Sequence, residues 1–389
     1  MAAATRSLLK NRKALFTKKV FHAQIALTVR QDKVPILSGD GPYNAQARKW
    51  LEDHFKAPLV VLTPSCTAAL EMSMLLMEVK PGDEVIVPSF TFSSTATAVV
   101  LVGATPVFVD CDPQTLNIDP EKIKHAITPK TKGIIVMHYA GISCNMMRIN
   151  QITQAQNLFV VEDAAQCIGA LYNNHQIGTQ SAAAAFSFHQ TKNISCGEGG
   201  CLVVNDPQLL ERAQIIRDKG TNRQQFFQGQ VDKYTWMDVG SSYLMSDLQA
   251  DYLLGQLKKL NIITKKRRSV WQAYHDGVQE LEEQKLLQRM HVPDGAYING
   301  HIYYFLMPTP ALAETAIRKL QEKGIKATGH YVPLHNSPAG KKYGRVSGEI
   351  KHASDCASRL VRLPINPEMT NEEVSLIIQT TKDLIIILS

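Results

Sequence analysis

Two charged residues enclose an unusual stretch of this chain: Asp163 and Lys192 are separated by 28 residues without Asp, Glu, Lys or Arg. Because 20% of all residues are charged, such a gap predicts a segment deep inside the protein. Asp163 ends the apolar run 158–161, and a carboxylate at a strand end could keep a cofactor's ring nitrogen protonated. An Asp that caps the next helix is the alternative.

Lys192 ends a predicted strand and turn over residues 186–192, and the glycine-rich stretch 197–200 follows it. A lysine behind an apolar strand loses hydration, which lowers the pKa of its amine and favours Schiff-base chemistry. A surface lysine whose stem covers apolar side chains is the alternative.

A third group of residues could bind phosphate. At Ser65, Cys66 and Thr67 a strand stops and a helix begins, so free backbone N–H groups and the helix dipole point at one spot. Ordinary N-capping explains the same residues. Phe92 follows another strand end and could stack on a flat ring, or pack in the core. In this order, phosphate-binding turn, aromatic ring, Asp and Lys form the layout of a pyridoxal phosphate enzyme.

The elements that would position these residues alternate along the chain. Short apolar runs rich in β-branched residues are separated by helical stretches from residue 58 onward, which predicts an α/β fold with a mostly parallel sheet. After about residue 250 long charged helices and a mixed tail follow. We therefore expect a basic arm and first helix over 1–36, a large cofactor-binding domain over 37–250 and a smaller C-terminal α/β domain over 251–389.

The charge pattern restricts the classes of partner. The net charge of +7 lies in the first 31 residues, so the remaining chain is balanced and offers no basic face for nucleic acid. The arm could be solvated or could serve targeting. Prolines interrupt the uncharged stretch 85–109, the best candidate for a membrane span, which argues against such a span. Seven cysteines without a CxxC pair indicate reduced thiols and a cytoplasmic protein without a zinc site or other metal centre.

The sequence resembles the DegT/DnrJ/EryC1/StrS sugar aminotransferases, from about residue 37 to near the C-terminus. The signature blocks are 161–166, 186–193 and 197–200. The dTDP-4-amino-4,6-dideoxygalactose transaminase subgroup is similar in further blocks at 62–67, 138–141, 219–223, 230–236 and 240–247. The resemblance implies the fold of aspartate aminotransferase, known as fold type I.

The same resemblance implies roles for single residues. Lys192 would form the Schiff base with pyridoxal 5'-phosphate and carry the proton, Asp163 would pair with the pyridine nitrogen, and Gln166 would lie against the ring opposite Phe92. The phosphate would be bound by Ser65, Cys66, Thr67, Ser187 and, from the partner chain of a homodimer, Ser242.

The implied reaction moves an amino group from L-glutamate to C4 of dTDP-4-dehydro-6-deoxy-D-glucose, which gives dTDP-4-amino-4,6-dideoxy-D-galactose for a cell-surface polysaccharide. The gluco epimer stays open as a product. A sugar dehydratase of the same family, which typically has His at the lysine position, and a non-catalytic sensing or nucleic-acid-binding protein are the remaining alternatives. Candidate contacts to the nucleotide sugar are Asp40, Arg223, Lys233, Tyr331 and His335.

Overall fold

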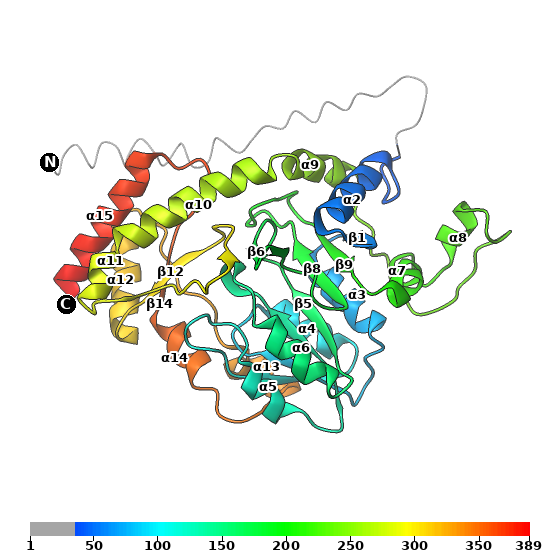
Figure 1. Ribbon diagram of the computed structural model, residues 1–389, viewed down its shortest axis with the longest axis horizontal. Helices are drawn as coiled ribbons and strands as arrows, with labels where there is room; N and C mark the ends of the chain where they lie inside the picture. The colour runs from blue at the N-terminus through cyan, green and yellow to red at the C-terminus, as the bar shows by residue number, and fades with distance from the viewer. Residues whose placement is uncertain (1–35) are drawn as a thin grey trace, which may run out of the picture.

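The computed structural model describes residues 36–389, so the predicted basic arm lies outside the described residues except for its last residue. An eight-stranded sheet in the order β1-β9-β8-β5-β4-β2-β3-β13 forms the centre of the molecule (Figure 1). Strands β5, β4, β2, β3 and β13 run parallel to their neighbours, whereas β9 is antiparallel to both β1 and β8. The prediction of a mostly parallel α/β sheet is confirmed. The strands are β1 (Leu59–Thr63), β2 (Glu84–Pro88), β3 (Thr105–Val109), β4 (Thr131–Met137), β5 (Phe159–Asp163), β8 (Ala183–Ser187), β9 (Gly200–Val204) and β13 (Arg345–Val346).

Helices cover both faces of this sheet because successive side chains of each strand point to opposite sides. In β1, Val61 packs toward α3 (Cys66–Leu76), α4 (Ser93–Leu101) and α7 (Leu210–Arg217). Its neighbour Val60 faces the opposite side, where it packs with α2 and α9. Helices α5 and α6 cover that same side over β2, β3 and β4. The helices of this second face are α2 (Pro42–Phe55), α9 (Asp247–Leu257), α5 (Pro120–Ala126) and α6 (Met146–Gln154).

The C-terminal part builds a second, three-stranded antiparallel sheet in the order β10-β12-β14. Helix α10 connects it to α9, and α12 and α15 pack beside it (Figure 1). A capping box of Thr370 and Glu373 starts α15. The elements are β10 (Gln288–Arg289), β12 (Tyr303–Leu306), β14 (Leu360–Leu363), α10 (Leu260–Gly277), α11 (Gln279–Glu283), α12 (Pro310–Glu322), α13 (Pro338–Tyr343), α14 (His352–Arg359) and α15 (Asn371–Leu388).

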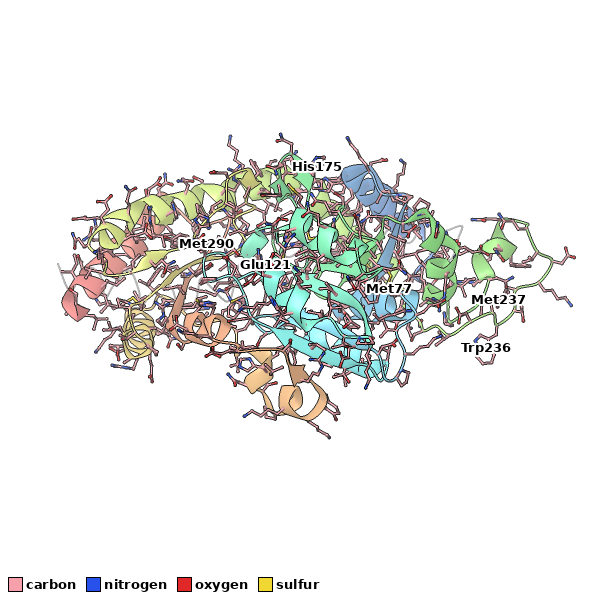
Figure 2. The ribbon with its side chains drawn as sticks, turned by 60° about the horizontal axis from the view of Figure 1, so that its bottom comes forward. Met77, Glu121, His175, Trp236, Met237 and Met290 are labelled. Carbon is pink, nitrogen blue, oxygen red and sulfur yellow. The ribbon has the colours of Figure 1, made fainter. Side chains whose placement is uncertain are left out.

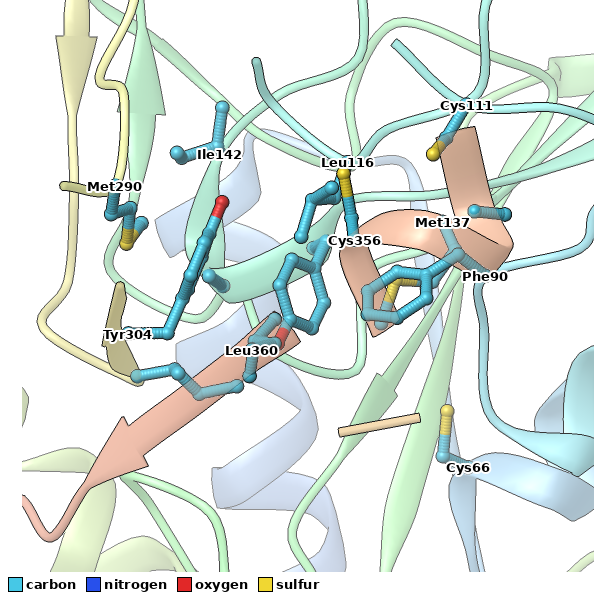
Figure 3. Close-up of a cluster of buried hydrophobic side chains, with 14 of the residues drawn as sticks. Cys66, Phe90, Cys111, Leu116, Met137, Ile142, Met290, Tyr304, Cys356 and Leu360 are labelled. Carbon is cyan, nitrogen blue, oxygen red and sulfur yellow. The ribbon is translucent and has the colours of Figure 1, made fainter. Parts of the chain in front are cut away.

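The C-terminal part also packs against the large sheet. Strand β13 pairs with the edge strand β3, and in a small third sheet β11 (Ala296–Tyr297) pairs with β6 (Leu171–Tyr172), which continues to β7 (His175–Gln176). One buried cluster joins Met137 of β4 with Tyr304 of β12 and Leu360 of β14 (Figure 3). The domain boundary near residue 250 stays a prediction, and the chain on its two sides shares a core.

The predicted strand before Lys192 needs a correction. Strand β8 covers Ala183–Ser187, so it begins earlier than the predicted strand and turn over 186–192, while the predicted turn before Lys192 is present. Alanine has a low strand propensity, which hid the start of this strand in the sequence. All five residues of β8 are buried in the middle of the sheet, where small side chains fit against both covering layers. Lys192 therefore lies in the loop beyond the strand.

Within residues 36–389 no helix is long and apolar enough to cross a membrane. The same residues contain no group of His, Cys, Asp and Glu side chains that could hold a metal ion.

Candidate active site

Strand register brings the predicted residues to one edge of the large sheet. Asp163, the last residue of β5, stands beside Ala185 of β8. Ser187, the last residue of β8, pairs with Gly200 of β9, and Gly200 pairs with Thr63 at the end of β1. The start of α3 follows directly after Thr63. The carboxyl ends of β1, β5 and β8 thus meet where α/β proteins bind ligands.

Asp163 is a buried carboxylate held by hydrogen bonds. The Thr95 hydroxyl donates to Asp163 Oδ2 at 2.7 Å, and the Ala165 N–H donates to Oδ1 at 3.2 Å. Burial raises the pKa of Asp163, although these hydrogen bonds and the charge of Lys192 act in the opposite direction. Residues 164–170 form turns, so the alternative of a helix-capping Asp is wrong. The carboxylate is suited to a cationic partner in the same pocket.

Lys192 lies in the loop after β8 and is half-buried. Its backbone N–H donates to the His189 carbonyl at 2.8 Å, but no hydrogen bond or ion pair with residues 36–389 holds its amine. Burial lowers the pKa of Lys192, while Asp163 acts to raise it. A half-buried amine near a buried carboxylate does not fit a snorkelling surface lysine, whose amine would be fully hydrated.

The predicted phosphate site is the first turn of α3. Ser65 caps the helix by accepting from the Ala68 N–H at 3.0 Å, and the Thr67 hydroxyl contacts the Ser94 hydroxyl at 2.7 Å. Gly200 passes close beside this turn, since a Cβ on it would lie 2.4 Å from the Cys66 nitrogen. Capping by Ser65 is therefore real, and it leaves the remaining N–H groups of the first turn directed at the sheet edge.

We expect Gly200→Ala to destabilise the apoprotein by about 1–3 kcal/mol, because the new methyl group collides with backbone and not with a flexible side chain. Retention of pyridoxal phosphate should fall as well. The matched control is Gly255→Ala in α9, where a Cβ meets nothing within 4 Å and should add about 0.5–1 kcal/mol of stability. Urea denaturation checks both; equal free energies of unfolding for wild type and Gly200→Ala would contradict the close approach.

Gln166 connects the sheet edge to the C-terminal part. Its Oε1 accepts from the Ala140 N–H at 2.6 Å, and its Nε2 donates to the Tyr331 hydroxyl at 2.9 Å. The ring of Phe92 lies 6.2 Å from that of Tyr331. Phe92 is 56% exposed, so the alternative of a core position is wrong. An amide and two aromatic rings from three parts of the chain therefore meet here.

The other candidate substrate contacts have partners elsewhere. Asp40 forms ion pairs with Arg217 and with Arg223, the latter at 2.8 Å. Burial acts to raise the pKa of Asp40, but the two guanidinium groups outweigh it and hold the pKa below its ordinary value. His335 contacts the Ser89 hydroxyl at 2.6 Å, just beyond the end of β2.

Arg223 starts α8 (Arg223–Phe227), which projects from the body with the loop behind it (Figure 1). Lys233 lies on this projection and is exposed, as are Trp236 and Met237 (Figure 2). Ser242 is exposed where the chain returns to the body. Among the described residues, no hydrogen bond or ion pair joins this projection to Asp163 or Lys192.

Sequence analysis missed two buried networks around the site. The Cys144 N–H donates to His138 Nδ1 at 2.9 Å, so the proton of this imidazole is on Nε2, which donates to Glu162 at 2.8 Å. Asn299 donates to the Gln166 carbonyl at 2.8 Å. These networks fix the backbone beside Asp163 and Gln166. His138 and Glu162 lie in the blocks 138–141 and 161–166 that resemble the family, but those blocks gave no sign that the two side chains meet.

Known protein sequences are similar to this chain over most of its length. The model of the DegT/DnrJ/EryC1/StrS aminotransferase family matches residues 25–382. The spore coat polysaccharide biosynthesis protein SpsC of Bacillus subtilis is 33% identical over 353 residues, which cover 89% of this chain and 90% of SpsC. An uncharacterized protein of Methanocaldococcus jannaschii, MJ1066, is 33% identical over 355 residues, with coverage of 89% and 90%.

Solved structures are similar over most of the chain. Spr1654, a candidate sugar aminotransferase of Streptococcus pneumoniae, superimposes in its PMP form with a TM-score of 0.83 at 27% identity, covering 91% of this chain and 94% of Spr1654. The aminotransferase TlmJ of Streptoalloteichus hindustanus has a TM-score of 0.82 at 26% identity, with coverage of 99% and 96%.

Proposed function

Since the chain belongs to the DegT/DnrJ/EryC1/StrS aminotransferase family, we propose that it transfers an amino group to a nucleotide-bound keto sugar. The protein is an aminotransferase of fold type I, and its cofactor is pyridoxal 5'-phosphate. The single observation that carries the proposal is the shared sheet edge of Asp163, Ser187 and the first turn of α3, with Lys192 in the adjoining loop.

The residues at this edge fit the cofactor. Gly200 leaves room beside the first turn of α3, so Ser65, Cys66, Thr67 and Ser187 would hold the phosphate. Asp163 would hold the ring nitrogen, with Gln166 and Phe92 at the ring. When bound, the cofactor supplies an electron sink for the carbon that exchanges its amino group.

Asp163 and Lys192 would divide the remaining work. Asp163 is oriented by Thr95 and Ala165, so its charge can keep a ring nitrogen protonated. Lys192 has an amine without a hydrogen-bond or ion-pair partner among the described residues, and burial favours its neutral form. A neutral amine can take the proton from the donor carbon and pass it on within the same half of the reaction, and in the other half it can act in the reverse order and deliver a proton to the acceptor carbon. Lys192 also argues against the dehydratase alternative, which uses His.

The substrate pair we propose is L-glutamate and dTDP-4-dehydro-6-deoxy-D-glucose, with dTDP-4-amino-4,6-dideoxy-D-galactose as product. The sequence blocks 230–236 and 240–247 support this choice, as does the part that SpsC takes in polysaccharide biosynthesis. The Tyr331 hydroxyl accepts a hydrogen bond from Gln166, which we place at the cofactor ring. Tyr331 is therefore a candidate sugar contact, together with His335. The gluco epimer remains the second candidate product.

We further propose a homodimer in which the projection around α8 reaches the partner's site. Trp236 is 79% exposed and Met237 is 56% exposed, and apolar side chains of this size favour burial against another surface. In such a dimer Ser242 would complete the phosphate site of the partner, and Asp40, Arg223 and Lys233 would approach its nucleotide. A chain with this function would act in the cytoplasm, where dTDP-sugars are made.

The proposal is tested with purified protein, pyridoxal phosphate, L-glutamate and the dTDP-bound keto sugar. We expect an aminated nucleotide sugar and 2-oxoglutarate in equal amounts. NMR coupling constants of the product distinguish an axial from an equatorial amine at C4. An amine at another carbon, or no transfer to any nucleotide-bound keto sugar, would refute the proposed substrate.

A further inference from the structure

Three buried polar side chains lie directly beyond Lys192. The Asn193 amide nitrogen donates to the Asn299 carbonyl at 3.1 Å, and His301 Nδ1 contacts the Asn193 amide oxygen at 2.9 Å. The His301 N–H donates to the side-chain oxygen of Asn299 at 3.1 Å. All three residues are buried. We call Asn193, Asn299 and His301 the Asn193 clamp, because together they hold both polar atoms of one amide next to the lysine.

The hydrogen bonds of the clamp fix where the His301 proton lies. Because the Asn193 nitrogen already donates to Asn299, the Asn193 oxygen faces the imidazole, and an amide oxygen only accepts. His301 therefore carries its proton on Nδ1. Burial lowers the pKa of His301 well below its ordinary value, and the positive charges of Lys192 and Arg267 lower it further, so the ring is neutral. It thus donates to Asn193 without adding a positive charge beside Lys192.

The C-terminal side of the clamp is firmly held. Arg267 of α10 donates through Nε to the Gly300 carbonyl at 3.1 Å and through a second nitrogen to the His301 carbonyl at 3.0 Å. The Asn299 side chain donates to the Gln166 carbonyl at 2.8 Å. The short segment before β12 is therefore fixed both to α10 and to the turns that follow β5.

The loop that carries Lys192 has a different kind of support. Two of its hydrogen bonds are local, from the Lys192 N–H to the His189 carbonyl and from the Gln190 N–H to the Gly197 carbonyl. The Asn193 side chain, in contrast, bonds to residues 106 and 108 positions away in the sequence. Since no hydrogen bond or ion pair with residues 36–389 holds the lysine amine, its position depends on the backbone of this loop.

We propose that His301 is a positioning residue for Lys192 and acts through Asn193. The inference rests on the function proposed above for Lys192 and adds the residue of the C-terminal part that orients it. A lysine that moves a proton at a substrate carbon must bring its amine close to that carbon, and a misplacement of about 1 Å can cost about 100-fold in rate. Asn193 follows Lys192 directly, so a clamp on its side chain restricts where the lysine backbone can lie.

Two substitutions separate the roles of the two ring nitrogens of His301. Asparagine carries its amide nitrogen as many bonds from Cα as Nδ1 is, so His301→Asn can still donate to Asn193. Glutamine carries its amide nitrogen one bond farther, at the place of Nε2, so His301→Gln leaves Asn193 without this donor. We expect His301→Gln to slow both half-reactions of the holoenzyme by about 10- to 100-fold with little change in half-saturation. His301→Asn should restore most of the rate.

Two further measurements distinguish positioning from a loss of the fold. With α-deuterated glutamate, the primary isotope effect on the donor half-reaction should rise in His301→Gln, because a misplaced amine slows the proton transfer in particular. In the apoprotein, amide hydrogen exchange over residues 189–196, followed by mass spectrometry, should be faster in His301→Gln than in wild type. His301→Asn should resemble the wild type in both measurements.

The other side of the hydrogen bond gives an independent check. Asn193→Ala removes the acceptor and should slow the reaction about as much as His301→Gln does. The double variant should be no slower than either single variant, because both changes remove the same hydrogen bond. His291→Gln, which replaces an exposed histidine of the same C-terminal part, is the matched control and should keep the wild-type rate.

Three results would overturn the inference. A wild-type rate in His301→Gln would show that the bond from Nδ1 to Asn193 is not needed. Equal losses in His301→Asn and His301→Gln would show that a donor at the place of Nδ1 is not what matters. Losses that add up in the double variant would mean that His301 does not act through Asn193. Failure of borohydride to attach the cofactor to Lys192 in the wild type would instead refute the role proposed for the lysine.

Discussion

Replacing Lys192 with alanine is expected to lower the rate of amino transfer by at least about 10³-fold, because the amine acts both as nucleophile toward the cofactor and as the base for the substrate proton. Burial lowers the pKa of Lys192, which favours the neutral amine that both roles require. The rate is measured as 2-oxoglutarate released from glutamate in the presence of the keto sugar.

The fold should survive this substitution. The Lys192 side chain has no hydrogen bond or ion pair with residues 36–389, so the apoprotein's melting temperature should change little. Retention of the cofactor through gel filtration should be lost. Lys258→Ala, at the exposed end of α9, is the control and should keep both activity and cofactor. A Lys192→Ala variant with more than a tenth of the wild-type rate would rule out the role proposed for this residue.

Asp163→Asn is expected to lower the rate by about 10²- to 10³-fold, since breaking a buried ion pair between carboxylate and ring nitrogen costs about 3–5 kcal/mol. The amide oxygen can still accept from the Ala165 N–H, and the Thr95 hydroxyl can rotate to accept from the new NH₂ group, so the geometry of the site is retained. What is lost is the negative charge that keeps the ring nitrogen protonated. The absorbance of the bound cofactor and the rate of each half-reaction measure the effect.

The apoprotein should respond in the opposite direction. Burial raises the folded-state pKa of Asp163. As pH rises, the unfolded chain therefore releases the carboxyl proton at a lower pH than the folded protein does. The contribution of Asp163 to stability therefore falls as pH rises from its ordinary pKa to the raised one. Asp163→Asn should match or exceed wild-type apoprotein in melting temperature at neutral pH. A lower melting temperature would contradict this account of the carboxylate.

Local sequence patterns were sufficient for the main residues of the site. Asp163 and Lys192 stand out because they end a long uncharged stretch, and Ser65 begins a helix directly after an apolar strand. The parallel sheet then follows from the alternation of strands and helices, and it brings strand ends to one edge. Each of these signals lies within a few residues of the position it identifies.

Contacts between distant segments left weaker signals. Strand β13 has two residues, too few for a pattern, and it reaches β3 across more than two hundred residues of sequence. Asn299 bonds to Gln166 only because the chain before β12 folds back onto the large sheet. The partner chain predicted to receive Ser242 is likewise beyond the reach of local patterns.

Borohydride reduction of the protein loaded with pyridoxal phosphate, followed by peptide mass mapping, tests the central claim most directly. The claim is that Lys192 is the residue that binds and serves the cofactor at the sheet edge. Reduction should attach the cofactor irreversibly to the peptide that contains Lys192, and prior addition of glutamate should prevent the attachment. Attachment to another lysine, or none in a folded protein that retains the cofactor, would contradict it.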